Sequence, residues 1–474
     1  MSADAPLVLG IDDGTTAVKV TLFDARLQPI AAARRPVATA HPAPGRVEQD
    51  AGEVLEAVLD AVAEVLPAAE GRPIVATGLD HQGESVLAWD PVTREPVSPI
   101  IVWQDKRGAD VYDDVAPELL ARTGLPPDPY FSAPKLAWLV REYGTDVRLG
   151  TVDAWLSDRL GAGWATDPST ASRTALQVLG DVGWDTALCA AFGIPRTSLP
   201  EVRPTVGDLG TLRHDRWPVD LPLRARVCDQ QAALAGAGCT VPGRAKATYG
   251  TGVFVLAHAG TTPAHAEGLL PTVAWQVPGR IEYALDGGVF TAGALLEWLA
   301  GTLGMAADPQ ALTELAATVP DAGGVRVLPA LAGAGAPWWR PDARAVIAGL
   351  TAGSTKAHIA RAAVEAIVHR VGDVVDAMGG VDLLRIDGGL TSSSLLCQLQ
   401  ADVLGIAVER SGADATVAGA AGLALVGAGL RADVRDLDGL LSPAERIEPH
   451  LDAAARTASR ATWSAFVQRA LDLH

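Results

Sequence analysis

Two glycine-threonine segments, more than 200 residues apart, are the parts of the sequence best suited to hold phosphate. Residues 10–16 (GIDDGTT) follow a short apolar run, and residues 248–252 (TYGTG) precede another. Each places glycine and hydroxyl side chains where one predicted strand turns into the next. Such a turn presents backbone N–H groups to an anion, and glycine allows close approach. Two of them predict a duplicated architecture, with one phosphate-binding hairpin per lobe and a nucleotide between the lobes.

The first turn carries residues that could bind a metal-nucleotide complex. Asp12 ends the first predicted strand, and its carboxylate could hold Mg²⁺ directly or through water while the turn holds phosphate. Lys19 is close enough along the chain to reach a phosphate oxygen. A simple Asp-Gly hairpin turn without a ligand is the alternative interpretation, because both residue types are common in turns.

Asp229 is the candidate general base. It stands where a strand (224–228) meets a helix (230–236), and a sugar or polyol hydroxyl needs a carboxylate to accept its proton during in-line phosphoryl transfer. Alternatively, Asp229 only caps the helix, which is a frequent role for aspartate. The nearby second phosphate turn favours the base.

Three further features could line a ligand site. Glu84 could accept hydrogen bonds from hydroxyls, and Trp103 could lie against the carbon face of a polyol. A solvated carboxylate and a core tryptophan are the alternatives. Gly388-Gly389 follows a predicted strand and would let the backbone approach a flat group such as adenosine, although a plain left-handed turn also explains it.

Strands alternate with helices along the chain, which predicts layered α/β architecture. The expected strands span 7–12, 18–24, 29 onward, 74–79, 85–89, 224–228 and 384–387. The expected helices span 54–66 (with Asp50 and Glu53 as a capping pair), 292–303, 357–378 and one from 392. Residues 195–222 are proline-rich and lack periodicity, so they are expected to wrap the surface.

Composition restricts the class of partner. The 474 residues favour at least two domains, and the formal charge of −18 argues against nucleic acid or an anionic membrane as a partner. The four cysteines show no metal or redox spacing and predict reduced, buried thiols in a cytoplasmic protein. The longest apolar run, 415–430, is shorter than the ~20 residues of a membrane span and predicts a closely packed buried helix.

Taken together, these segments resemble the FGGY carbohydrate kinases, and among them the glycerol kinases most. The resemblance covers roughly residues 7–430. It rests on ten ordered segments: 10–16, 101–107, 128–132 with 135–138, 165–169, 199–204, 229–232, 249–252, 336–339, 349–351 and 387–389. It implies an α/β, two-lobed, actin-like (ribonuclease H-like) ATPase fold with the active site in the interlobe cleft. The lobes would span residues 1–232 and 233–474.

The resemblance also implies ATP, Mg²⁺ and transfer of the γ-phosphoryl group to a hydroxyl of a small polyol or sugar. Asp229 would be the base and Asp12 would serve the metal. The expected substrate residues are Gly83, Glu84, Trp103, Tyr130, Asp229, Gln230 and Phe254. The expected ATP residues are Thr15, Thr16, Lys19, Thr251, Gly293, Glu297, Gly389 and Ser393. The resemblance further points to a homodimer, although no residue identifies an interface.

Departures from the family pattern bear on the substrate. Glycerol kinases carry an arginine where this chain has Gly83, and its loss would remove hydroxyl donors and leave space for a larger polyol or a ketose. Glu297 and Asp13 replace glutamines, and Ala415 stands where a glutamate is usual, which would weaken ATP contacts.

The sequence therefore predicts an ATP-dependent kinase for a terminal hydroxyl of a small polyol or sugar. Glycerol and a longer acceptor (tetritol, pentitol or ketopentose) both stay open. An inactive relative that binds a sugar or nucleotide and regulates a partner is the alternative from another class. The presence of both Asp12 and Asp229 favours the enzyme.

Overall fold

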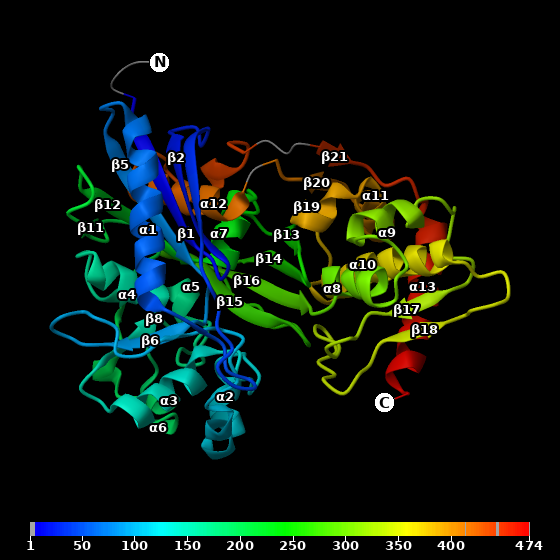
Figure 1. Ribbon diagram of the computed structural model, residues 1–474, viewed down its shortest axis with the longest axis horizontal. Helices are drawn as coiled ribbons and strands as arrows, with labels where there is room; N and C mark the ends of the chain where they lie inside the picture. The colour runs from blue at the N-terminus through cyan, green and yellow to red at the C-terminus, as the bar shows by residue number, and fades with distance from the viewer. Residues whose placement is uncertain (1–4, 413, 442–444, 474) are drawn as a thin grey trace.

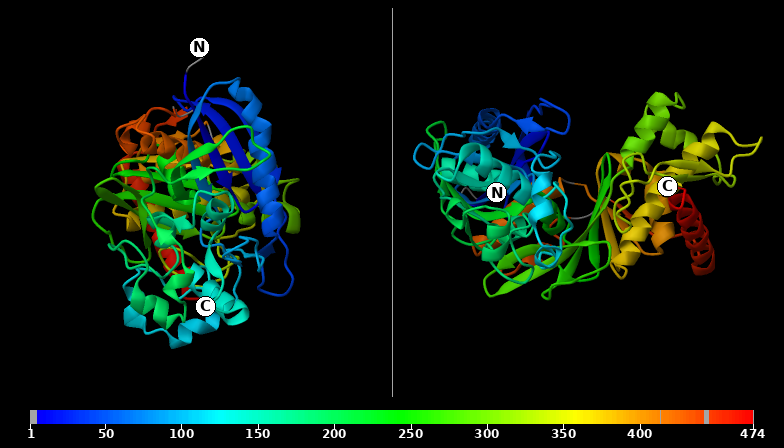
Figure 2. Two further views of the ribbon diagram at one scale, coloured as in Figure 1. Left: turned by 90° about the vertical axis from the view of Figure 1, so that its left-hand side faces the viewer. Right: turned by 90° about the horizontal axis from the view of Figure 1, so that it is seen from below.

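Two large mixed β-sheets organise the protein, one in each half of the chain. In the computed structural model, which describes residues 5–412, 414–441 and 445–473, the blue and cyan elements lie on one side of Figure 1 and the yellow and red ones on the other. Figure 2 shows the strands of the second sheet extending between the two bodies. The described part of the chain therefore forms two connected lobes.

The first sheet has six strands in the order β11-β12-β5-β1-β2-β3. Its strands are β1 (Leu7–Asp13), β2 (Ala17–Asp24), β3 (Pro29–Pro36), β5 (Ile74–His81), β11 (Thr211–Leu212) and β12 (Leu221–Cys228). Because β1, β5 and β12 are parallel neighbours, their carboxyl ends meet at one edge. Strand β1 pairs antiparallel with β2, so the predicted hairpin around Gly14 is confirmed.

Helix α1 (Ala51–Val65) covers one face of this sheet, and Asp50 caps it by accepting from the Glu53 backbone N–H, as predicted. A smaller sheet in the order β4-β7-β6-β8 extends the first lobe. Its strands are β4 (Glu48–Gln49), β6 (Val86–Trp89), β7 (Ile100–Ile101) and β8 (Arg148–Thr151). Around it lie α2 (Pro117–Ala121), α3 (Ser132–Tyr143), α4 (Val152–Arg159), α5 (Pro168–Ala171), α6 (Thr186–Ala191) and the short pair β9 (Ala165–Thr166) and β10 (Glu201–Val202).

The second sheet has seven strands in the order β15-β16-β14-β13-β19-β20-β21. They are β13 (Arg244–Tyr249), β14 (Val253–Gly260), β15 (Leu270–Val277), β16 (Arg280–Val289), β19 (Leu383–Asp387), β20 (Val408–Arg410) and β21 (Glu445–Ile447). Helices α8 (Gly293–Glu297), α9 (Pro309–Ala316), α10 (Lys356–Ala377), α11 (Ser394–Leu404) and α13 (Ala453–Leu471), with the pair β17 (Arg326–Leu328) and β18 (Val346–Ala348), complete this lobe. The predicted hairpin around Gly250 is confirmed.

Helix α12 (Ala415–Gly427) comes late in the chain but packs against β1, β5 and β12 of the first lobe, beside α7 (Asp229–Gly236). Glycine makes this approach possible. A Cβ on Gly419 would lie 1.8 Å from the Ala232 carbonyl oxygen, and one on Gly78 would lie 2.0 Å from that of Ala420. Such distances exclude any side chain. The small-residue run thus forms the predicted buried helix, and it fixes α7 against the first sheet.

Two sequence expectations need correction. Only the first part of the helix expected over 292–303 is α-helical, as α8, which ends at Glu297. Trp298–Thr302 form a π-helical turn instead, because glycines at 301 and 304 weaken α-helix formation there. Residues 195–222, expected to wrap the surface, contribute the short strands β10 and β11 and the start of β12, and several of their side chains are buried, among them Val206, Leu212 and Trp217. No helix among the described residues is long and apolar enough to cross a membrane.

Candidate active site

The carboxyl edge of the first sheet gathers the acidic residues. Asp12 lies opposite Asp80 in the parallel pairing of β1 with β5, and Cys228, next to Asp229, lies opposite His81. Ligand sites of α/β sheets lie at this edge, outside the carboxyl ends of the strands. Strand pairing therefore brings Asp12 and Asp229 together from positions more than 200 residues apart.

Asp229 has the surroundings of a general base. It is the first residue of α7 and not its cap: Cys228 occupies the cap position, and Asp229 Oδ1 accepts from the Gln230 backbone N–H at 2.6 Å. Burial, followed by the negative charges of Glu84 and Asp12, raises the pKa of Asp229 to about 6. A carboxylate with this pKa is ionised near neutral pH and is a stronger proton acceptor than an ordinary aspartate.

The first phosphate turn is open to a ligand. Thr16 is exposed and Thr15 is half-buried, with its hydroxyl accepting a hydrogen bond from the Trp103 indole N–H at 3.1 Å. This bond joins the predicted phosphate turn to the predicted substrate pocket. Lys19 Nζ lies 2.6 Å from Asp414 Oδ2 and 3.3 Å from Asp12 Oδ2. Burial alone would lower the pKa of Lys19, but these two carboxylates raise it, so the amine stays charged.

Two buried carboxylates beside Asp12 have no hydrogen-bond partners. Neither oxygen of Asp13 nor of Asp80 is satisfied, and both side chains are fully buried. Burial raises the pKa of both groups, and the charge of Asp12 adds to it. No group of three or more metal-binding side chains is preassembled within residues 5–412, 414–441 and 445–473. The carboxylates of Asp12, Asp13 and Asp80 suit Mg²⁺, because this ion keeps several waters and binds through one or two carboxylates plus phosphate oxygens.

Five of the residues predicted to contact the nucleotide lie in the second lobe: Thr251, Gly293, Glu297, Gly389 and Ser393. The Gly293 backbone N–H donates to the Gly250 carbonyl at 3.0 Å, and those of Ala292 and Ala294 donate to the Thr251 carbonyl at 2.9 and 3.1 Å. Strand β19 pairs with β13 so that Asp387, just before Gly388-Gly389, lies opposite Thr248. The three glycine-containing turns therefore share one end of the second sheet, and Thr251, Glu297 and Gly389 are exposed there. The Ser393 hydroxyl caps α11 by accepting from the Leu396 N–H.

Three of the predicted substrate residues, Trp103, Tyr130 and Phe254, line a second opening. The other four (Gly83, Glu84, Asp229 and Gln230) are not among the described residues that line it. Trp103 and Tyr130 pack edge to face at 5.5 Å, and both line a cavity of about 380 Å³ together with Phe254, Phe290, Arg173 and Asp286. Glu84 has a left-handed backbone (φ 56°), a conformation that non-glycine residues adopt at a cost and that is frequent at functional sites. The Gln230 side chain accepts from Lys246 Nζ at 2.5 Å, which joins α7 to the second sheet.

A buried lysine holds the loop that presents Tyr130. Lys135 Nζ lies 2.7–2.8 Å from the backbone carbonyls of Pro129, Tyr130 and Phe131. Burial lowers the pKa of Lys135 to about 7. Three carbonyl acceptors match the three N–H donors of an ammonium group, so the charged form fits this site.

The expectation that Gly83 leaves open space for a larger substrate is wrong at that position. A Cβ on Gly83 would lie 2.5 Å from Cys228 Sγ, so the thiol already fills the place where a side chain would begin. Burial, and then the charge of Asp229, raises the pKa of Cys228, which keeps the thiol neutral. Any additional room in the pocket must come from elsewhere.

Sequence reasoning missed four residues of this region: Arg173, Lys246, Asp286 and Asp80. Arg173 lies four residues beyond the recognised segment 165–169, and its guanidinium contacts Glu84 (Nε to Oε1, 2.6 Å). Asp286 lies in the second half of strand β16, after the charged residues Arg280 and Glu282, and approaches Arg173 Nη1 at 3.1 Å. Within residues 283–289 of this strand Asp286 is the one charged residue, and this is the local signal that could have identified it.

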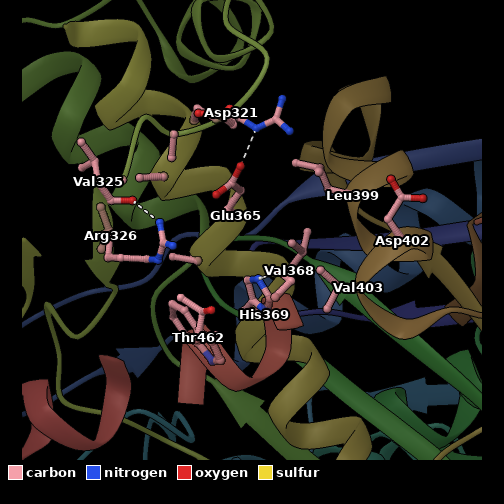
Figure 3. Close-up of a pocket in the computed structure, with 18 of the residues that line it drawn as sticks. Asp321, Val325, Arg326, Glu365, Val368, His369, Leu399, Asp402, Val403 and Thr462 are labelled. Carbon is pink, nitrogen blue, oxygen red and sulfur yellow. Dashed lines mark hydrogen bonds and ion pairs between the residues drawn. The ribbon is translucent and has the colours of Figure 1, made fainter. Parts of the chain in front are cut away.

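Another cavity, of about 500 Å³, lies in the second lobe between β17, α10, α11 and α13 (Figure 3). The Arg361–Glu365 ion pair and His369 lie along it, and the imidazole of His369 stacks on Trp463 at 5.1 Å. Among the described residues that line it, none is a predicted substrate or nucleotide residue. His369 is buried and packs within the protein.

Comparisons with known proteins agree with this architecture. Residues 7–236 match the N-terminal domain of the FGGY family of carbohydrate kinases, and residues 245–428 match its C-terminal domain. A glycerol kinase of Citrifermentans bemidjiense is 41% identical over 98% of both chains, and one of Thermus brockianus is 42% identical over 98% of both. The crystal structure of Plasmodium falciparum glycerol kinase with ADP superposes with a TM-score of 0.92 at 28% identity, over 99% of each chain. A xylulose kinase of Rhodospirillum rubrum gives 0.87 at 25% identity, over 98% of each.

The chain therefore belongs to the FGGY family of carbohydrate kinases. The expected α/β, two-lobed, actin-like ATPase fold is confirmed by the superposition. The protein is an ATP-dependent, glycerol-kinase-like phosphotransferase with an alcohol group as acceptor.

Proposed function

We propose that this kinase transfers the γ-phosphoryl group of ATP to a terminal hydroxyl of a small polyol, with Asp229 as the general base. The observation that carries the proposal is the position of Asp229, whose pKa is about 6, at the same sheet edge as Asp12 and the first phosphate turn. The likeness to glycerol kinases over 98% of the chain supports a three-carbon triol as one acceptor.

In the proposed reaction, Asp229 accepts the proton of the substrate hydroxyl as its oxygen forms a bond to the γ-phosphorus. The bond to the bridging oxygen breaks in line, and ADP leaves. Glu84, Gln230 and Tyr130 orient the acceptor, while Trp103 and Phe254 cover its carbon face. Closure of the lobes excludes water and so limits ATP hydrolysis.

Backbone and hydroxyl groups of Thr15, Thr16 and Thr251 would meet the phosphates, with Lys19 beside them. Gly293, Glu297, Gly389 and Ser393 would border the nucleoside. Asp12 would hold Mg²⁺, directly or through water, and the ion would neutralise charge that develops on the phosphate oxygens. The unpartnered carboxylates of Asp13 and Asp80 support a cation at this edge.

Assembly, location and lobe boundary are also proposals. Four buried, free cysteines suit a reducing compartment, which supports a cytoplasmic protein. The homodimer implied by the resemblance can be tested by light scattering after size exclusion. The proposed division at residues 232 and 233 falls inside α7, so limited proteolysis should spare this bond.

The test is ADP release over a panel of C3 to C6 polyols and ketoses, with the wild type and Asp229→Asn. We expect polyol-stimulated ADP release that the variant loses. Tight polyol binding without turnover by the wild type would instead support the inactive regulator.

A further inference from the structure

Arg173 joins two carboxylates that belong to different sheets. Its guanidinium contacts Glu84, which follows β5 of the first sheet, and Asp286 on β16 of the second, at 2.6 and 3.1 Å. The side chains of all three are at most 10% exposed. The guanidinium also lies 5.7 Å from the centre of the Tyr130 ring. Arg173 therefore sits where the two lobes meet around the predicted acceptor pocket.

One oxygen of the Glu84 carboxylate and one of the Asp286 carboxylate are available to a ligand. Arg173 engages Glu84 Oε1 and Asp286 Oδ2. Glu84 Oε2 and Asp286 Oδ1 receive no hydrogen bond from any described residue, yet neither is among the fully buried unsatisfied atoms. Both oxygens can thus accept a hydrogen bond from a ligand hydroxyl.

The combined charge of Glu84, Arg173 and Asp286 determines which class of ligand can bind. Two carboxylates face one guanidinium, and Asp229 adds a further negative charge near Glu84. Lys246 is the other cation near Asp286, and its hydrogen-bond partners Gln230 and Thr248 are neutral. Three carboxylates therefore stand against two cations, which leaves an excess of one negative charge. A net negative pocket repels carboxylate and phosphate groups and accepts neutral hydroxyl donors. The apolar walls of Trp103, Tyr130 and Phe254 suit the carbon side of a polyol.

The acceptor pocket extends away from Asp229. Tyr130, Arg173 and Asp286 line the cavity described above, whereas Glu84 and Asp229 are not among the described residues that line it. Arg173, whose Nε lies 2.6 Å from Glu84 Oε1, connects this cavity to the acidic edge of the first sheet. A cavity of about 380 Å³ exceeds what a three-carbon triol would fill.

We propose that Asp286, oriented by Arg173, forms a second hydroxyl-binding subsite, so that the preferred acceptor is a neutral polyol of four or five carbons. This inference rests on the proposed kinase function. Glu84 binds a hydroxyl near Asp229, and Asp286 accepts a hydrogen bond from one further along the carbon chain. Arg173 acts on the substrate through these two carboxylates and is a positioning residue.

The test compares kcat/KM for glycerol, a tetritol, a pentitol and a sugar acid of five carbons. For the wild type we expect the best longer polyol to exceed glycerol about tenfold and the sugar acid at least a hundredfold. Asp286→Asn keeps the shape but weakens the acceptor, and should lower the ratio of longer polyol to glycerol about tenfold. Asp286→Glu keeps the charge but shortens the pocket by one methylene, and should also shift the ratio towards glycerol.

Asp220→Asn, at an exposed surface ion pair, is the matched control and should leave the ratio unchanged. If Asp286→Asn does not fold, the ratio measured with Asp286→Glu decides the question. A wild type that prefers glycerol, with a ratio insensitive to either Asp286 variant, would overturn the subsite while the kinase proposal stands. Absence of turnover with every polyol would overturn the kinase proposal itself.

Discussion

The raised pKa of Asp229 suits a general base but lowers the stability of the folded protein at neutral pH. This pKa of about 6 means that folding favours the protonated acid. The stability this group contributes is present below its unfolded pKa and is lost as the pH rises through about 6. Activity has the opposite dependence, because the base must be ionised.

We therefore predict that kcat/KM falls about tenfold per unit of pH below about 6, following one ionisation. Asp229→Asn should lower kcat by roughly 10²–10⁴-fold. The same variant should melt a few degrees above the wild type at pH 8 and not at pH 4, because the amide removes a buried charge. Pre-steady-state ADP release and calorimetric melting check these outcomes. Undiminished kcat in the amide variant would exclude Asp229 as the base.

A second prediction concerns the contact between Gly83 and Cys228, because the Cys228 thiol lies where a side chain at residue 83 would begin. We predict that Gly83→Ala lowers the free energy of unfolding by about 1–3 kcal/mol through overpacking. Combining it with Cys228→Ala should recover most of that loss. Gly353→Ala is the matched control, because a Cβ there meets only Thr351 Oγ1, at 3.7 Å.

Urea titration measures this double-mutant cycle. Simple additivity of the two substitutions would mean that the thiol does not occupy that space. For the same reason, the Cβ of an arginine introduced at 83 would lie 2.5 Å from Cys228 Sγ, so the thiol would have to move before that side chain could enter the pocket.

Among the elements, the crossing of α7 with α12 determines the position of Asp229, the proposed base. We predict that Gly419→Ala destabilises the protein and lowers kcat, because its Cβ would meet the Ala232 carbonyl oxygen at 1.8 Å and displace α7. Gly422→Ala on the same helix is the control. Its Cβ meets only flexible leucine side chains, the nearest at 3.0 Å, so its effect should be smaller. Thermal melting and steady-state kinetics compare them; equal effects would contradict the role of this crossing.

The hydrogen bonds by which Lys135 holds the loop 129–131 give another prediction. Lys135→Met removes three hydrogen bonds to the carbonyls of residues 129–131 and should raise KM for the polyol more than it changes KM for ATP. Lys135→Arg should only partly restore polyol KM, since a guanidinium does not match a compact ammonium site. An equal rise in both KM values would indicate a general loss of structure.

The elements whose apolar residues recur at regular spacing could be predicted from the sequence. Both phosphate hairpins, α1 with its Asp50 cap, and α10 follow from apolar spacing and turn residues. The position of α12 could not be foreseen, because it depends on glycines in β5 and α12 that come into contact only in the folded chain. Arg173 and Asp286 escaped detection for a related reason. The contact of Arg173 with Glu84 comes from packing within the first lobe, and its contact with Asp286 comes from packing between the lobes.

For the whole molecule, the pocket residues come from both lobes, so ligands should hold the lobes together. We predict that ADP and a polyol, each at about 100 times Kd, raise the free energy of unfolding by about 2.7 kcal/mol each, and by more than the sum when added together. Small-angle scattering should show a smaller radius of gyration with both ligands. Strictly additive melting shifts and an unchanged radius would argue against closure between lobes.

The crossing of α7 and α12 also constrains biosynthesis. During translation, the first sheet leaves the ribosome almost two hundred residues before the helix that covers its apolar face and supports the base. A nascent chain that stops anywhere before residue 415 exposes that face and has no properly seated Asp229. Folding of the proposed catalytic centre is thus delayed until residues 415–427 have been synthesised, and we expect chains that stop earlier to be inactive and prone to aggregate or bind chaperones.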